Sequence, residues 1–514
     1  MLTTLAAPAF AGTWYIEDGN ITISAGTEAG TNKVEQAGKD TVDNDKDTII
    51  TNQNKDTASS NTVTIEAKDK DDKVEVTLKD VNIDTSSRNK AAVSVTGSGN
   101  TTIKLDGDNH LTGGNGIYSN SSGSLTISGD ENDSLTAQGG DSRNGIYSVS
   151  GDVTISGGTV TATGGNSTGS YGSGGDGIHS GSLTISGGTV TATGGGSTGS
   201  NGLGGRGICS DSGGVTISGG STVTANGGNG SHGGSGISSS SGVTVSDGTV
   251  TANGGNGGNV SGDGIRSDGG VTISGGTVTA NGGNSTNSSG GYGISSLDVA
   301  ISSGTVTANG GDSKDGYGGD GIHSNDIDLS GSLELTAKAG SPNGKALSQN
   351  GRELDLNAIK DKLGPGAKVT ATDADGKVID QVPIPRPVEP EGPVIPEESS
   401  SSSDGGSAAP SAPASPLPGL TVTDKDGQRI SYTSTQSGNT LTVCVGRFTA
   451  SFRISLAALR QLRAEGIEAI TFQTILCSTT LSLDELLAMG GEDAEVVLTH
   501  HIRSSTLTVG GKAV

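Results

Sequence analysis

The sequence is poor in several residue types on which most folds depend. Aromatic residues make up 2% of the 514 positions, and there is a single tryptophan. So few rings exclude a core of the usual globular kind and, taken alone, would indicate a disordered chain. The three cysteines, Cys209, Cys444 and Cys477, are too few for disulfides to carry so long a fold. A disulfide between Cys444 and Cys477 and a pair of separate thiols are both open.

Basic residues are also scarce, with 31 Lys and Arg against 55 Asp and Glu and a formal net charge of -24. This balance argues against nucleic acid or an anionic membrane surface as the partner, whereas it is compatible with cation binding. No apolar run is long enough to cross a membrane.

What the chain has in abundance is a repeat. A Gly-Ile step recurs with its isoleucine at Ile117, Ile146, Ile178, Ile208, Ile237, Ile265, Ile294 and Ile322, at intervals of 29, 32, 30, 29, 28, 29 and 28 residues. A fixed period of this length indicates a repeat architecture. Within each repeat the apolar residues alternate with threonine and serine, as in Leu183-Thr184-Ile185, and this period of two is typical of strands.

Each repeat therefore predicts three short strands, and stacked repeats of this kind form an all-β parallel β-helix. A single coil cannot bury enough apolar surface to fold alone, so stability must come from stacking. Counting the less regular strands before Ile117, we expect about ten coils, or a rod roughly 48 Å long at about 4.8 Å per coil.

Composition divides the chain into five parts. Residues 1–11 end in Ala9-Phe10-Ala11 and are typical of the remnant of a secretory signal peptide. Residues 12–345 form the β-helix with its N-terminal cap, and residues 346–382 form a C-terminal cap with one short helix over Asn357–Leu363. Residues 383–418 hold ten of the thirteen prolines and predict a disordered linker. Residues 419–514 predict a small α+β accessory domain with helices after Ser455 and Ser482.

Equivalent residues of successive coils stack into ladders, and four ladders are candidates for function. Asn226, Asn253, Asn281 and Asn309 predict a structural ladder of hydrogen-bonded amides. The Thr-x-Thr pairs of the third strand resemble the ice-binding face of some β-helical antifreeze proteins, although threonine is also the ordinary choice for an exposed strand.

The third ladder is the residue after each Gly-Ile, which points outward if isoleucine points inward. Aromatic, imidazole and guanidinium groups on this line could bind a chain-like ligand such as a polysaccharide. The candidates are Tyr118, Tyr147, His179, Arg266 and His323.

The fourth ladder is the row of loops between Gly-Gly and Gly-Ile, which could form a binding surface. One of these loops carries Asp312, Asp315 and Asp320, whose carboxylates could hold Ca²⁺. No carboxylate pair or other catalytic constellation is visible in the repeats, so we expect the protein not to be an enzyme.

The Gly-Ile-x-Ser phrase, the Val-Thr-Ile-Ser-Gly-Gly-Thr-Val-Thr-Ala phrase and the segment Ile103–Asn109 carry a resemblance. They resemble the secreted β-helical carbohydrate-binding proteins of anaerobic clostridia and related gut bacteria, which have a pectate-lyase-like fold. The resemblance covers roughly Gly12 to Gln381. It implies a right-handed parallel β-helix, binding of plant cell-wall polysaccharide and association with calcium.

Together these observations predict a secreted or cell-surface bacterial protein that binds polysaccharide without cleaving it, with calcium assistance and cell-envelope attachment as further expectations. Two rival hypotheses are an adhesive stalk that binds a host or neighbouring-cell protein, and a polysaccharide lyase.

Overall fold

The protein is described from a computed structural model. The chain divides into two compact units, Met1–Glu389 and Pro390–Val514. The structure describes residues 12–364 and 366–383 of the first unit. In the second it describes 420–513 except 424–428, 431, 438, 446–448, 475–477, 490–493, 501–504 and 511. The predicted signal remnant and, apart from Pro383, the predicted linker lie outside the described residues.

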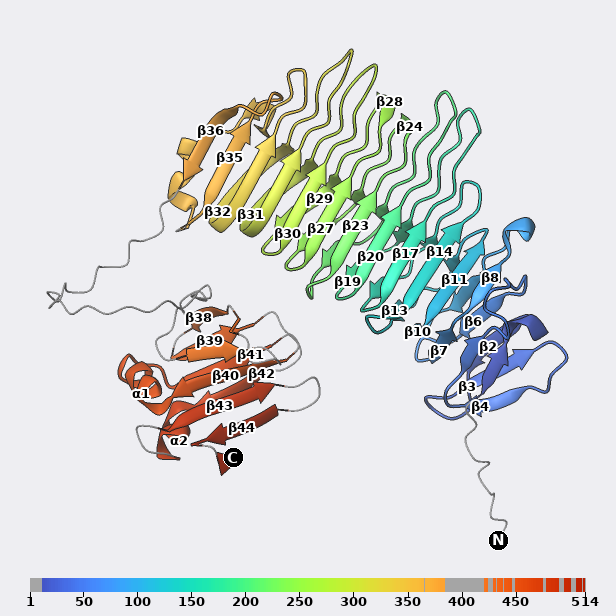
Figure 1. Cartoon of the computed structure of the whole chain (residues 1–514), viewed down its shortest axis with the longest axis horizontal. Helices are drawn as coiled ribbons and strands as arrows, with labels where there is room; N and C mark the ends of the chain where they lie inside the picture. Colours follow the sequence, from blue (N-terminus) through green and yellow to red (C-terminus); the bar gives the residue numbers. More distant parts are fainter. Residues whose placement is uncertain are drawn as a thin grey trace, which may run out of the picture. The chain divides into compact units, whose positions relative to one another are not determined.

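The first unit is a β-solenoid of about 13 turns, which confirms the predicted parallel β-helix (Figure 1). A typical coil contains three short strands, β15 (Ile146–Ser148), β16 (Val153–Ile155) and β17 (Thr159–Thr163), each paired in parallel with its equivalents in neighbouring coils. There are more turns than the roughly ten expected, because the N-terminal coils lack the Gly-Ile phrase by which coils were recognised.

Three rows of parallel strands run along the β-helix. The first, the Gly-Ile row, contains β2 (Ile21–Ala25), β6 (Val63–Ala67), β9 (Val93–Gly97), β12 (Ile117–Ser119), β15, β18 (Ile178–Ser180), β21 (Ile208–Ser210), β25 (Ile237–Ser239), the starts of β29 (Ile265–Ile273), β31 (Ile294–Asn309) and β32 (Ile322–Lys338), and β33 (Leu347–Gln349). The second contains β1 (Thr13–Tyr15), β5 (Ile49–Thr51), β7 (Lys73–Lys79), β10 (Asn100–Asp106), β13 (Leu125–Ser128), β16, β19 (Leu183–Ile185), β22 (Val215–Ile217), β26 (Gly242–Val245) and the later part of β29. The third contains β8 (Asn82–Asp84), β11 (Asp108–Gly113), β14 (Ser134–Gly139), β17, β20 (Thr189–Thr193), β23 (Thr222–Asn226), β27 (Thr249–Asn253), β30 (Thr277–Asn281), the ends of β31 and β32, and β35 (Lys368–Thr372).

The interior is a set of aliphatic ladders. Each Gly-Ile isoleucine is fully buried and pairs with the isoleucine of the next coil, as Ile178 does with Ile208. Val190 and Ala192 of β20 are likewise fully buried, beside the partly or fully exposed threonines of the same strand. Since every coil contributes the same small side chains at the same places, this core needs few aromatic residues.

The glycine of the Gly-Ile step is required by close packing of backbone. A Cβ on Gly177 would lie 2.6 Å from the nitrogen of Thr193 and 2.7 Å from the oxygen of Gly207. This close approach, rather than a turn, is what requires glycine at this position. The turn glycine is the second one of the Ser-Gly-Gly-Thr phrase, for example Gly188 with φ +79°.

The asparagine ladder is present in the third row. Asn253, Asn281 and Asn309 each donate a side-chain hydrogen bond of 2.8 Å to the asparagine one coil earlier, starting from Asn226. Asn226 in turn donates to the Thr193 hydroxyl at 3.4 Å. The amides thus form a line of hydrogen bonds along the β-helix axis.

The N-terminal end is closed by the only tryptophan. Trp14 is buried, and its indole N–H donates to Asp45 at 3.0 Å. Asp45 lies at the end of β4 (Val42–Asp45), which extends β3 (Asn32–Gln36) and β2 as an antiparallel meander. The segment around Asp45, although rich in charged residues, therefore contributes a buried carboxylate to the cap.

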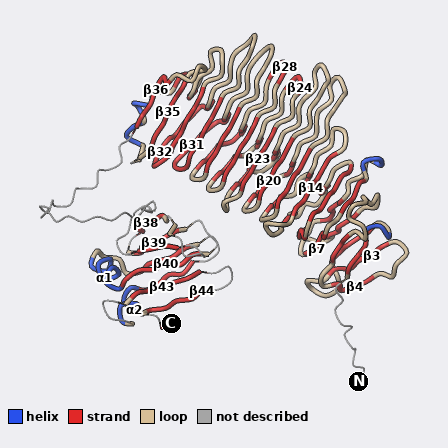
Figure 2. Tube along the Cα trace, in the orientation of Figure 1, coloured by secondary structure: helices blue, strands red, loops and turns tan. Residues whose placement is uncertain are grey.

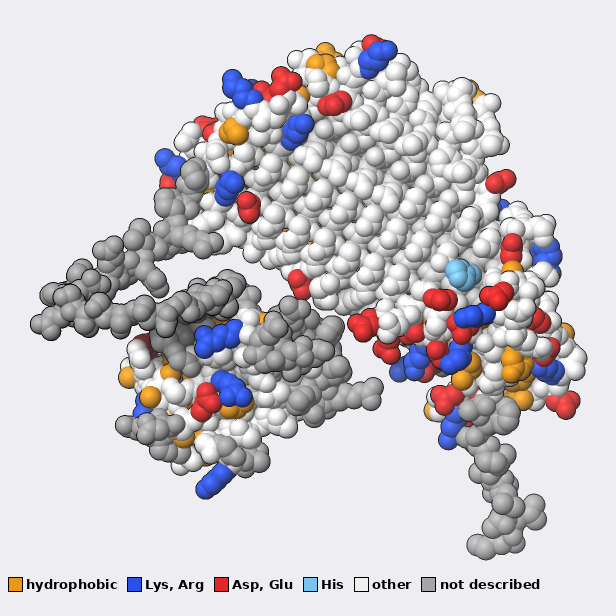
Figure 3. Space-filling model, in the orientation of Figure 1, with side chains coloured by type: hydrophobic (Ala, Val, Ile, Leu, Met, Phe, Trp, Pro, Cys, Tyr) orange, Lys and Arg blue, Asp and Glu red, His pale blue; other side chains and the backbone are white. Residues whose placement is uncertain are grey.

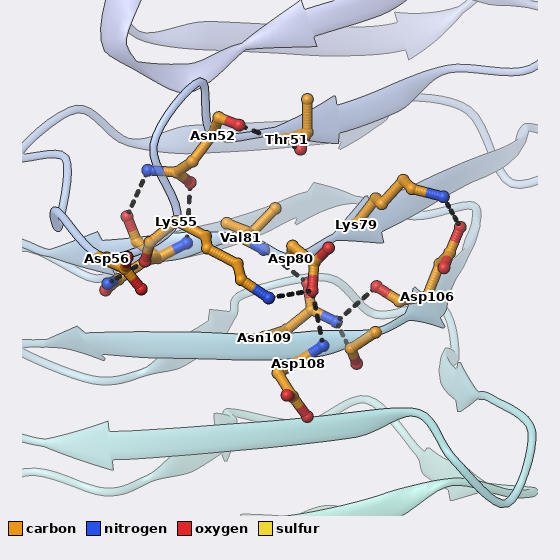
Figure 4. A network of polar contacts seen from close by, with 12 residues as sticks. Thr51, Asn52, Lys55, Asp56, Lys79, Asp80, Val81, Asp106, Asp108 and Asn109 are labelled. Carbon is orange, nitrogen blue, oxygen red and sulfur yellow. Dashed lines mark hydrogen bonds and ion pairs between the residues drawn. The ribbon is translucent and has the colours of Figure 1, made fainter.

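Polar contacts also join the N-terminal coils to one another (Figure 4). The Lys79 amine lies 2.7 Å from the Asp106 carboxylate, and the Asn109 side chain accepts from the backbone N–H of Val81 at 3.0 Å. Asp80 accepts from the N–H of Asp108 at 3.1 Å. In these irregular coils, side chains fix the turns that glycine pairs fix later in the chain.

At the C-terminal end the parallel rows stop. β34 (Arg352–Glu353) and β36 (Val378–Pro383) pair antiparallel with β33 and β35. The helix expected over Asn357–Leu363 is instead two 3₁₀ turns, η3 (Leu356–Ala358) and η4 (Lys360–Lys362). Two further 3₁₀ turns, η1 (Ile16–Asp18) and η2 (Ser86–Arg88), lie in the N-terminal coils.

The described residues of the second unit form a small domain with two sheets and two helices. One sheet has the order β37 (Leu420–Thr423), β40 (Ala450–Ser455), β43 (Glu495–His500), β44 (Ser505–Val509) and β45 (Lys512–Ala513); the other has β38 (Thr433–Ser437), β39 (Thr440–Cys444), β41 (Ala469–Gln473) and β42 (Ser478–Ser482). The predicted helices are α1 (Leu456–Ala464) and α2 (Leu483–Ala488), capped by Ser455 and Ser482. Cys444 is a free thiol, whereas Cys477 lies outside the described residues.

We predict that Gly177→Ala lowers the melting temperature of the β-helix, because the new methyl group meets backbone atoms that cannot move without breaking the stack. The expected cost is about 1–3 kcal/mol. Gly196→Ala is the matched control, since a Cβ on Gly196 would lie no closer than 3.4 Å to another atom, the backbone oxygen of Asn229. Thermal unfolding followed by circular dichroism measures both, and equal effects of the two substitutions would contradict the packing argument.

Candidate ligand-binding stripe

The outward residue of each strand in the Gly-Ile row forms a continuous line, called the stripe below. The register pairs neighbours directly, so each member stacks on the one in the next coil. Most members are partly exposed, but Cys209 is 1% exposed and departs from the expectation that every position of this line faces solvent. The members are Tyr118, Tyr147, His179, Cys209, Ser238, Arg266, Ser295 and His323.

The first three members of the stripe form a run of rings. The centroids of Tyr118 and Tyr147 lie 5.7 Å apart, and those of Tyr147 and His179 lie 4.9 Å apart in an edge-to-face arrangement. These contacts are typical of favourable ring pairs. Three of the five predicted ligand-binding residues are therefore in one continuous surface.

His179 lies in a charged cluster that the sequence analysis did not identify. Its Nδ1 is 2.8 Å from Asp176 and its Nε2 is 2.9 Å from Asp211. Burial lowers the pKa of His179, but hydrogen bonds to Asp176 and Cys209 raise it by more, to about 10. With a carboxylate at each ring nitrogen, the cationic imidazolium satisfies both contacts.

The remaining stripe candidates lie further along the β-helix. Arg266 is 58% exposed and borders a hollow of about 320 Å³, which is lined by Leu203, Arg206, His232, Ser238, Arg266 and Asp268 among others. His323 stacks on Tyr292 with a centroid distance of 4.4 Å and contacts Asp320 at 2.8 Å. A second hollow of about 200 Å³ lies over this pair and includes Tyr317. The five candidates thus occupy one face, as three separate groups.

Where Asn or Asp precedes a Gly-Ile step, its side chain makes a further contact between coils that sequence analysis missed; these residues are called the pre-Gly-Ile ladder below. The side-chain oxygens of Asn115, Asn144 and Asp176 each accept the backbone N–H of the equivalent residue in the next coil, at 2.9, 2.7 and 2.6 Å. Asp263 and Asp320 do the same at 2.8 and 2.7 Å. The signal was present in the sequence as recurrent Asn or Asp at this position.

The three aspartates predicted to bind calcium do not converge. Among the described residues, the only His, Cys, Asp and Glu side chains that bring at least three ligand atoms within 4.8 Å of one another are Asp176, His179 and Cys209. Asp312 accepts the N–H of Ser341, and Asp320 is held by Lys345 and His323. Asp312, Asp315 and Asp320 therefore do not form one ready set of calcium ligands.

The loops of the fourth ladder lie along one edge of the β-helix (Figure 2). Two loop strands, β24 (Gly230–His232) and β28 (Gly257–Val260), pair in parallel there. Large apolar side chains are exposed on this edge, with Tyr171 79% and Tyr317 67% exposed. The face that carries the Thr-x-Thr strands β17, β20, β23, β27 and β30 is, by contrast, almost free of charged side chains (Figure 3).

Comparison of the chain with models of protein families, with curated proteins and with solved structures gives no match. The resemblance to clostridial carbohydrate-binding proteins is therefore a hypothesis about this chain. None of the helices in the described ranges has the length and apolar character needed to cross a membrane.

Two aspartates of the pre-Gly-Ile ladder, Asp263 and Asp320, should change the free energy of unfolding in opposite directions as the pH rises. Burial raises the pKa of Asp263 from its ordinary value of 3.8 to about 6. The contribution of this carboxyl to folding stability is therefore fully present below pH 3.8, where it is protonated in both the folded and the unfolded chain. That contribution is lost as the pH rises through 6. Asp263→Asn keeps the acceptor and should raise the unfolding free energy at pH 8 by on the order of 1–3 kcal/mol, with the gain vanishing near pH 4.

Asp320→Asn is the matched comparison. Burial raises the pKa of Asp320, but its contacts with His323 and Lys345 lower it by more, to a net value below 3.8. This carboxylate stabilises the fold above pH 3.8 and loses its effect as the pH falls through its folded pKa. Asp320→Asn should therefore lower the free energy of unfolding at pH 8, and this loss should become smaller as the pH falls. Thermal unfolding against pH measures both, and the same sign for both variants would refute the assignment.

Proposed function

We propose that this protein is a non-catalytic polysaccharide-binding β-helix that acts outside the cell, with the stripe as its binding surface. The observation that carries the proposal is the run of Tyr118, Tyr147 and His179, whose rings lie 5.7 and 4.9 Å apart on one face. Planar side chains suit the apolar faces of sugar rings, and one outward side chain presented by every coil suits a ligand that is itself an extended chain.

The rest of the stripe supports the same ligand class. Arg266 offers guanidinium donors at the hollow further along the stripe, and Arg-carboxylate pairs favour an acidic sugar. His323 and Tyr292 form a second planar platform further along. The proposal includes calcium as a bridge between protein and acidic glycan, and it assigns no catalytic residue.

A protein ligand is the second candidate, and the loop edge favours it. Leu203, His232 and Val260 stack in successive coils, and Leu203 and Val260 are each 45% exposed. With Tyr171 they give this edge apolar side chains that an adhesive contact could bury.

The test is binding of the full chain to a panel of neutral and acidic glycans, with and without a calcium chelator. We expect binding to an acidic or cellulosic polysaccharide, and Tyr118→Ala combined with Tyr147→Ala should weaken it at least tenfold through loss of ring stacking, about 1.4 kcal/mol or more. Loss on chelation would identify calcium as a bridge.

Tyr171→Ala is the matched control, since this tyrosine lies on a loop away from the stripe. If Tyr171→Ala abolishes binding and the stripe variant does not, the loops are the site. Absence of binding to any glycan refutes the proposal and favours a protein partner, and unsaturated sugar products would establish a lyase.

A further inference from the structure

The cluster around Cys209, defined here as Asp176, His179, Arg206, Cys209 and Asp211, has a composition unlike the rest of the stripe. His179 is the central residue of β18 and Cys209 that of β21, and the two are register partners in adjacent coils. Asp176 precedes β18 by one glycine, and Asp211 follows β21 directly. Four potential ligands thus come from two neighbouring coils whose backbones are fixed by the parallel ladder.

The contacts within the cluster bring three of these groups together, with Asp211 at their side. Asp176 and Asp211 lie 2.8 and 2.9 Å from the two nitrogens of His179, and the Cys209 sulfur lies 3.2 Å from Asp211. The ligand atoms of Asp176, His179 and Cys209 lie within 4.8 Å of one another. Around a tetrahedral zinc ion, ligand atoms are about 3.3–3.8 Å apart, so small side-chain rotations close the difference.

The three proposed ligands are also largely shielded from water. The side chains of His179 and Asp176 are 16% and 14% exposed and Cys209 is 1% exposed, whereas Asp211, at 59%, and Arg206 are exposed. The two carboxylates here are balanced by the imidazolium of His179 and by Arg206, whose Nη1 lies 2.8 Å from the Cys209 sulfur. A divalent cation can take over that balancing role while bonding to sulfur, nitrogen and oxygen at once.

We propose that Asp176, His179 and Cys209 form a binding site for a thiophilic divalent metal of the zinc class, with a water molecule as the fourth ligand and Asp211 beside the site at the other ring nitrogen of His179. Sulfur with imidazole and carboxylate selects zinc over calcium or magnesium, which prefer oxygen. Binding displaces the Arg206 guanidinium from the sulfur and the protons from the thiol and the imidazole. The site lies on the stripe, but the inference does not rest on polysaccharide binding.

The β-helix contains its own control for this site. The Asp-Gly-Ile-His sequence at Asp176–His179 recurs at Asp320–His323, and the second pair has the same 2.8 Å contact. The residue stacked on His323 in the next coil is Ser348, whereas Cys209 stacks on His179. The second motif lacks the thiol, so it should not bind the metal tightly.

Titration of the full chain with Co²⁺, a spectroscopic substitute for zinc, tests the proposal. In a Cys444→Ser, Cys477→Ser background, one equivalent should give a thiolate-to-cobalt charge-transfer band together with intense visible bands of a tetrahedral site, and Zn²⁺ should displace both. Cys209→Ser should abolish the charge-transfer band; it should fold, since the next stripe position is Ser238, and circular dichroism checks this. Asp176→Asn should weaken binding about 10–100-fold.

His323→Ala should leave the spectrum unchanged, and Arg206→Gln should tighten binding because the competing guanidinium is gone. Absence of a thiolate band in the background protein, or a band that survives His179→Ala, would overturn the proposal. If the background protein does not fold, the same charge-transfer band should be present in the difference spectrum between wild type and Cys209→Ser, and its absence would overturn the proposal.

Discussion

Backbone hydrogen bonds between successive coils are the interaction on which the rest of this molecule depends. A single coil buries too few aliphatic side chains to offset its ordering entropy, so it is stable only when its strands pair with the coils before and after it. Pairing in strict register then places Ile178 on Ile208 and Asn253 on Asn281, and every other ladder follows. The same constraint excludes a Cβ at Gly177, because it would lie 2.6 Å from the backbone nitrogen of Thr193.

This stacking also decides where function can reside. Inward positions must repeat, because each fills the same small space in its coil. Outward positions are free to vary, and their variation along one line places two tyrosines, a histidine and a cysteine in direct succession. Chemistry in this protein therefore arises between coils, from residues about 30 positions apart in the sequence, as with His179 and Cys209. At each end of the β-helix there is no further coil to stack on. Trp14 with Asp45 covers the N-terminal end, and the antiparallel strand β36 closes the C-terminal end.

Much of the fold could be predicted because its signals are local and repeated. The Gly-Ile period and the alternation within Leu183-Thr184-Ile185 specify the strands, and Ser455 and Ser482 cap the helices that they predict. The first coils were undercounted because side-chain contacts such as Lys79 to Asp106 replace the glycine phrase there. The site was only partly predictable. The stripe follows from the alternation of inward and outward residues. The cluster at Cys209 depends on the orientation of side chains from two neighbouring coils, which the sequence does not specify. It also includes Asp211, which lies in a turn of variable length. Asp312, Asp315 and Asp320 are not among the described side chains whose ligand atoms cluster, because closeness in a loop sequence does not by itself make side chains converge.

The most direct test of the account is deletion of one whole coil. Removal of Ile178–Gly207 joins Gly177 to Ile208 and leaves every inward ladder in register. This variant should fold with the same β-sheet circular dichroism spectrum and unfold cooperatively at a slightly lower temperature. Removal of Ile178–Gly188 alone puts the Thr189 strand where an isoleucine strand belongs, and it should abolish cooperative unfolding of the β-helix. If the whole-coil deletion unfolds the protein, or both deletions are tolerated equally, register between coils is not what holds the structure together.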